Sequence, residues 1–90
     1  MNKIRRGQIQ EAIDLLENAK GIIESCKDEE QEYIDNMPEP LQNSERAQNA
    51  ENAVSNLDEA EYNISDIIET LEDAVSNIDN AINSAEQAKE

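Results

Sequence analysis

The side chains of this chain that could carry chemistry are one cysteine and 22 carboxylates, and histidine is absent. Histidine is the commonest general base and metal ligand, so its absence removes the usual routes to acid–base catalysis. Cys26 has no histidine to activate it and falls on an apolar stripe, which predicts a buried core thiol rather than a nucleophile. We therefore expect no catalytic residue and no enzymatic activity.

Carboxylates that point inward from facing helices can bind a metal, usually together with a Glu-x-x-His motif. Glu30 and Glu61 both interrupt apolar rows, but no histidine joins them and they fall near opposite ends of the expected seam. We interpret both as partly exposed residues at its rim. The chain also lacks a glycine-rich phosphate loop and an EF-hand loop with a central glycine. The sequence thus predicts neither a metal nor a cofactor.

One charged surface in the second half of the chain is a candidate binding site. Steps of three and four residues place acidic side chains and one tyrosine on a single helix face, away from the apolar rows. This acidic ridge consists of Asp58, Glu59, Tyr62, Asp66, Glu69, Glu72 and Asp73. An exposed tyrosine among charges is a frequent hot-spot composition at protein interfaces. A solvated helix face whose tyrosine covers a neighbouring side chain would have the same pattern.

A long helix must carry this ridge, and heptad spacing predicts one over residues 44–89. One apolar row consists of Ala50, Leu57, Ile64, Leu71, Ile78 and Ala85, and the other of Val54, Ile68, Val75 and Ile82. Residues 41–90 contain neither proline nor glycine. Apolar rows sustained over this many heptads are typical of coiled coils and helical bundles.

A second helix is predicted over residues 3–35. Its apolar positions follow steps of three and four: Ile9, Ala12, Ile13, Leu16, Ala19, Ile22, Ile23 and Cys26, with Tyr33 continuing the stripe. Pro38 and Pro40 predict a loop over residues 36–43, after which Asn43 or Ser44 could cap the next helix. Because the connection is short, we expect a single domain over residues 1–90, an all-α antiparallel two-helix coiled-coil hairpin with the longer helix second.

This hairpin would leave apolar surface without cover. The second helix would project past the first, and a flanking row would widen its apolar stripe at Ala53, Ala60, Ile67, Ala74 and Ala81. With only 18 large aliphatic residues and one cysteine, the chain needs a partner to become stable. We therefore predict a homodimer that forms a four-helix bundle. The candidate dimer interface consists of Ile67, Val75, Ile78, Ile82 and Ala85.

The charge is strongly negative, with 22 acidic and 7 basic residues and a net charge of −15. Such a chain repels nucleic acid and anionic membranes and attracts basic surfaces, although acidity can also serve only to keep a helical surface soluble. The N-terminus lacks the apolar run of a secretory signal, and no segment approaches the ~18 apolar residues of a membrane span. A lone cysteine fits a reducing compartment. We expect a cytoplasmic protein with a basic protein partner and no contact with membranes or nucleic acid.

A long, strongly acidic helix can mimic DNA if its charge density is similar to that of a duplex. A helix of ~45 residues is ~68 Å long, so fifteen net charges give about one per 4.5 Å, whereas B-DNA carries about one per 1.7 Å. A fully overlapped dimer would reach about one per 2.3 Å. Only the dimer therefore approaches the charge density of a duplex.

The segment DEEQEYIDNMPEPLQNSERAQNAENAVSNLDEA, residues 28–61, resembles small acidic helical proteins encoded by phages and prophages of Gram-positive bacteria. The matching residues are Asp35, Asn36, Met37, Pro38, Glu39, Leu41, Gln42, Ser44, Glu45 and Arg46. The resemblance implies a phage origin and a location in the bacterial host cytoplasm. That group has no assigned activity, so the resemblance implies no catalytic residue.

Two functions remain in competition. In the first, the chain is an acidic interaction protein that binds a basic surface on a host protein and can inhibit that protein, and its dimer resembles DNA in charge density. In the second, it is a coiled-coil scaffold or assembly chaperone for phage particles and acts through its apolar overhang. The first predicts binding that weakens steeply with salt, and the second predicts salt-tolerant association.

Overall fold

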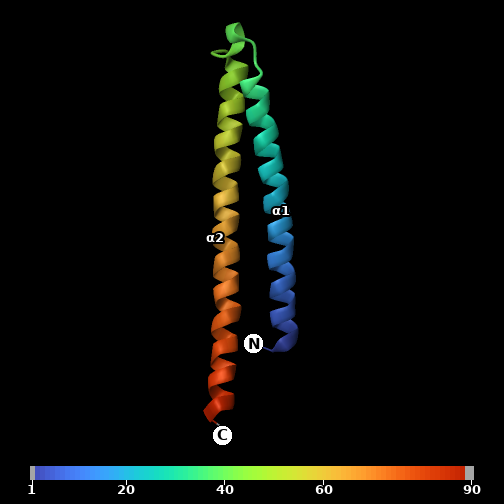
Figure 1. The fold of residues 1–90 in the computed structure, drawn as a ribbon, viewed down its shortest axis with the longest axis vertical. Helices are drawn as coiled ribbons and strands as arrows, with labels where there is room; N and C mark the ends of the chain where they lie inside the picture. The colour runs from blue at the N-terminus through green and yellow to red at the C-terminus, as the bar shows by residue number, and fades with distance from the viewer. Residues whose placement is uncertain (1, 89–90) are drawn as a thin grey trace.

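Two helices and a short turn make up the fold. The computed structural model describes residues 2–88, with side chains for residues 2–77 and Ala85. Helix α1 (Lys3–Asp35) and helix α2 (Glu45–Ala88) lie side by side and run antiparallel, joined through the 3-10 helix η1 (Glu39–Leu41) (Figure 1). The described residues include no strand. The predicted all-α architecture with a longer second helix is therefore confirmed.

The ends of α1 follow from local hydrogen bonding. At its start, the Asn2 side chain accepts a hydrogen bond from the Arg5 backbone N–H at 2.8 Å and so caps the first turn. At its end, the Asn36 N–H still donates to the Glu32 carbonyl, but Pro38 is extended, with φ −56° and ψ 142°. Proline disfavours helical geometry at the residue before it, so α1 cannot continue. Its bounds coincide with the range expected from the sequence.

The turn contains structure that the sequence analysis treated as loop. Pro40 lies inside η1, where its missing N–H costs nothing because the first turn of a helix leaves its N–H groups without internal partners. Helix α2 then begins after Ser44. The Ser44 hydroxyl donates to the Leu41 carbonyl at 2.6 Å and accepts from the Ala47 backbone N–H at 3.2 Å. Of the two expected caps, Ser44 is the one that acts.

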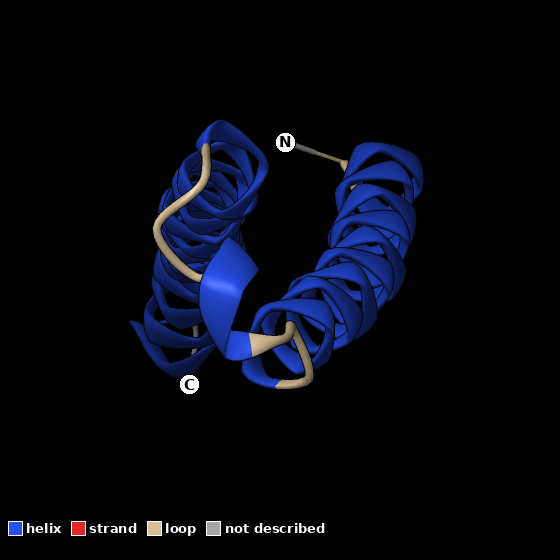
Figure 2. Ribbon diagram, turned by 90° about the horizontal axis from the view of Figure 1, so that it is seen from above, coloured by secondary structure: helices blue, strands red, loops and turns tan. Residues whose placement is uncertain are grey.

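The hairpin is long and thin. Its extents are 74 × 17 × 15 Å and its radius of gyration is 20.6 Å, against about 12 Å for a compact chain of this length. Seen from above the turn, the two helices form a single layer (Figure 2). The buried apolar side chains in the described part are Ile13, Met37, Ala47, Ala50 and Ile68. The core is thus a narrow seam, and α2 projects past the start of α1 (Figure 1).

The Ser44 cap gives the first prediction. Replacing Ser44→Ala removes the acceptor for the Ala47 N–H, and we expect the free energy of unfolding to fall by about 1 kcal/mol in urea denaturation. Asn43→Ala is the matched control, because the neighbouring residue does not cap α2. An equal or larger loss for Asn43→Ala would show that the cap is assigned to the wrong residue.

Candidate functional site

The acidic ridge lies on the surface of α2. All seven of its residues are exposed. Tyr62 keeps 67% of its surface accessible, and the Asp58 side chain keeps 72%. The rise of α2 spreads these groups along the helix, so the ridge is an elongated charged strip rather than a pocket.

A shallow hollow borders the ridge where α2 meets α1. Lys20 of α1 lines it together with Asp58, Glu61, Tyr62 and Ser65 of α2. The structure thus brings two ridge residues, Asp58 and Tyr62, next to a basic residue of the other helix. This basic neighbour was not anticipated from the spacing of the ridge residues.

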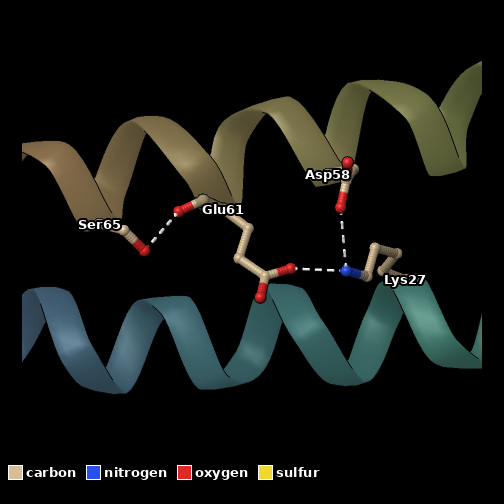
Figure 3. Close-up of polar contacts among 4 residues, drawn as sticks. All are labelled: Lys27, Asp58, Glu61 and Ser65. Carbon is tan, nitrogen blue, oxygen red and sulfur yellow. Dashed lines mark hydrogen bonds and ion pairs between the residues drawn. The ribbon is translucent and has the colours of Figure 1, made fainter.

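An ion-pair cluster joins the two helices beside this hollow. The Lys27 ammonium of α1 donates to Glu61 at 2.7 Å and to Asp58 at 3.1 Å (Figure 3). The Lys27 and Glu61 side chains are only 22% and 18% exposed. Ser65 adds a hydrogen bond from its hydroxyl to the Glu61 backbone carbonyl at 3.1 Å (Figure 3). Asp58 is therefore both a ridge residue and a contact between the helices.

Glu30 and Glu61 are both half-buried, as expected for partly exposed residues. The expectation that they lie near opposite ends of the seam is wrong, because Lys27, three residues before Glu30, pairs with Glu61. Glu61 points inward because Lys27 neutralises it, and a shielded charge is tolerated only when it is paired. Sequence reasoning missed Lys27, although a signal was present. Lys27 lies four residues after Ile23, at a position where the spacing of α1 calls for an apolar residue, and Glu61 likewise interrupts an apolar row of α2. The two residues have opposite charge.

The ion-pair cluster shifts the pKa of Lys27. The hydrogen bond to Glu61, followed by the one to Asp58, raises the pKa of the Lys27 ammonium above its ordinary value. Both carboxylates favour the charged form of the lysine, and this outweighs the partial loss of its hydration. The cluster is thus a structural link with a permanently charged lysine at neutral pH, not a proton-transfer site.

Cys26 does not lie where the sequence analysis expected it. Its side chain is exposed, so the prediction of a buried core thiol is wrong. The physical reason is that the apolar sector of α1 is wider than the part covered by one neighbouring helix. Lys27, one residue and 100° further round the helix, faces α2 instead.

The candidate dimer interface is described only in part. Ile67 is 48% exposed, Ala85 is exposed and Val75 is half-buried. The side chains of Ile78 and Ile82 lie outside the described part of the structure. Ile67 therefore remains available for association, whereas Val75 already packs partly within the hairpin.

The described side chains include no cluster of three or more Cys, Asp or Glu groups arranged to hold a metal ion. Within residues 2–88, neither helix combines the length and apolar content needed to cross a membrane. The chain matches no protein-family model, no curated protein and no solved structure.

The ion-pair cluster gives the second prediction. Lys27→Met leaves the shielded Glu61 without its partner, so we expect a lower free energy of unfolding in urea denaturation. The double variant Lys27→Met with Glu61→Leu removes both charges from apolar rows and is expected to regain at least the original stability. Lys20→Met is the control, since the described residues show no ion pair for Lys20. A double variant no more stable than Lys27→Met would contradict this account.

The raised pKa of Lys27 gives the third prediction. A raised folded-state pKa contributes stability that is complete below the ordinary lysine pKa of about 10.4 and is lost as the pH rises above it. Thermal melting at a series of alkaline pH values should therefore show a difference between the original chain and Lys27→Gln that shrinks as pH increases. A difference independent of pH over this range would exclude the charged lysine as its source.

Proposed function

We propose that this chain is a small interaction protein of phage type that binds a basic surface on another protein through the acidic ridge, rather than an enzyme. The observation that supports it best is the charge distribution of α2. Residues 47–88 contain ten acidic residues and no lysine or arginine. A partner therefore meets negative charge along the exposed side of α2 from Glu51 to Asp73.

The ion-pair cluster leaves most of the ridge available. Lys27 neutralises Glu61 and offsets Asp58 at one end of the ridge. Further along α2, Asp66, Glu69 and Asp73 are exposed, and the described part of the chain shows no ion pair for them. Their charge can act on an approaching basic protein, with the outward Tyr62 as a contact that adds apolar area.

Self-association belongs to the same proposal. Over a length of 74 Å, fifteen net charges give about one per 5 Å, and a fully overlapped dimer gives about one per 2.5 Å, against about 1.7 Å for B-DNA. A homodimer would therefore compete with nucleic acid for a basic surface better than a single chain. We place this activity in the cytoplasm of a bacterial host, as the lone cysteine and the phage resemblance suggest.

A scaffold or assembly chaperone for phage particles is the alternative function. The exposed Ile67 favours it, because it offers apolar surface to another chain. The backbone of α2 also projects past the start of α1 (Figure 1). Binding through such surface would tolerate salt, whereas binding through the ridge would not. Salt dependence therefore separates the two functions.

The fourth prediction tests the ridge. The variant Asp66→Asn, Glu69→Gln, Glu72→Gln and Asp73→Asn should lower affinity for a fluorescent lysine-rich peptide at least about tenfold at low salt, because close charge pairs are lost. The control neutralises four exposed acids of α1: Asp14, Glu17, Asp28 and Glu32.

Both variants change the net charge from −15 to −11, since each removes four negative charges. Equal losses of affinity would mean that only the total charge matters. Retained affinity in the ridge variant would show that the ridge is merely solvated surface, and the scaffold function would then be preferred.

A further inference from the structure

Helix α1 carries an apolar row that α2 does not cover. Ile4, Leu15 and Ile22 are 74%, 64% and 58% exposed. They are separated by eleven and seven residues, close to whole numbers of helical turns, so they share one face. Tyr33, 45% exposed, and the exposed Cys26 continue the row toward the turn. Exposed Gln8 and Glu11 lie on the same face between Ile4 and Leu15, so the uncovered apolar surface is continuous from Leu15 through Ala19 and Ile22 to Cys26. A continuous exposed apolar surface, unlike scattered apolar residues, indicates a surface that another chain covers.

Helix α2 carries a second row at seven-residue spacing, and it is made mostly of small residues. The row consists of Ala53, Ala60, Ile67 and Ala74. Ile67 is 48% exposed and Ala74 is exposed, whereas the two earlier alanines are half-buried at the edge of the seam. The exposed residues next to this row include Asn49, Asn56 and Asn63, which carry no charge.

Both rows open on the same side of the hairpin. Tyr33 of α1 and Asn49 of α2 line one hollow between the helices. Tyr33 follows Ile22 by eleven residues, and Asn49 precedes Ile67 by eighteen, which are again nearly whole turns. Glu30, Glu45 and Arg46 also line this hollow, so the end of the shared face near the turn is charged. The two rows together form one apolar face along the middle of the hairpin. Asp58 and Tyr62 line a different hollow with Lys20, so the acidic ridge is turned away from the apolar face.

The accessible surface is larger than that of a compact monomer and leaves room for an interface of standard size. The chain exposes 6848 Å², whereas a compact monomer of its mass would expose about 5,300 Å². The excess of about 1,500 Å² exceeds the roughly 800 Å² that each partner buries in a stable interface of standard size. An interface along this face could therefore remove from water the area that the hairpin leaves exposed.

Shape and charge both favour a second copy of this chain as the partner. A two-fold axis that places α1 of one copy on α2 of the other pairs the large side chains of α1 with the alanines of α2, twice in the same interface. Large side chains packed against small ones fill space as in a protein core. The same arrangement keeps the two acidic ridges on opposite outer sides, which minimises repulsion between two chains of net charge −15.

We infer that two copies pair through this apolar face, with Leu15 and Ile22 of each copy packed on the alanine row of the other. The inference rests on the self-association proposed above but not on binding by the acidic ridge. It moves the centre of the interface from the far end of α2 to the middle of the hairpin. It also assigns a packing role to the α1 residues that α2 leaves uncovered.

Two measurements on the unmodified chain test this interface. Sedimentation equilibrium from low to high micromolar concentration should show the mass rising from 10.1 kDa to about 20 kDa. Over the same concentrations, under reducing conditions before labelling, the rate of maleimide modification of Cys26 should fall by about tenfold or more, because the thiol becomes covered.

Variants then locate the contact. Leu15→Glu with Ile22→Glu should weaken dimerisation by about 100-fold or more, since two anchors are lost. Ser55→Glu with Ser76→Glu adds the same charge at exposed positions outside the apolar face and should weaken it by less than about threefold at moderate salt. Circular dichroism establishes whether the variants remain helical. If the variant with Leu15→Glu and Ile22→Glu does not fold, the protection of Cys26 in the unmodified chain alone tests the interface.

The outcomes separate the two proposals. A mass of 10.1 kDa at every concentration overturns both the interface and self-association. A dimer in which Cys26 reacts as fast as in the monomer overturns the interface and leaves self-association standing. A folded Leu15→Glu and Ile22→Glu variant that still dimerises with the original affinity overturns the interface as well.

Discussion

The structure depends on one constraint: two helices side by side can cover only a narrow strip of each other. Ile13 is 2% exposed, whereas Leu15, two residues later on the same helix, is 64% exposed. Both are large aliphatic residues, so the difference comes from geometry alone, because two residues turn the helix by about 200°. Each helix therefore has an inner side in the seam, an uncovered apolar side and a polar side. On α2 the polar side is the acidic ridge.

The Lys27 cluster connects these sides. Its lysine crosses the seam, Glu61 lies at the inner side of α2, and Asp58 belongs to the ridge. Two opposite charges that lie within apolar rows can form an ion pair only in a few arrangements, which differ in the rotation of each helix about its axis and in the register between the helices. We therefore interpret the cluster as a device that selects how α1 and α2 face each other, and hence which apolar row stays outside.

The sequence predicted the two helices, their limits and the acidic surface, because proline, capping residues and three- and four-residue spacing act locally. It could not predict which residues another helix covers. Cys26 and Ile22 fit the apolar stripe of α1 as well as Ile13 does, and only packing separates them. The partner of Glu61 was missed for a related reason. Long helical side chains lean toward their own N-terminus, so in this antiparallel pair the side chains of Lys27 and Glu61 extend toward each other along the helices before they meet (Figure 3).

The central claim is that the hairpin is half of a side-by-side assembly whose outer sides are acidic. Small-angle X-ray scattering of the concentrated protein tests it most directly, because it gives mass and longest dimension together. Pairing along the apolar face adds thickness but little length, so we predict twice the mass of one chain and a longest dimension close to the 74 Å of the single hairpin. A particle with the mass of one chain, or a dimer much longer than 74 Å, would contradict this account.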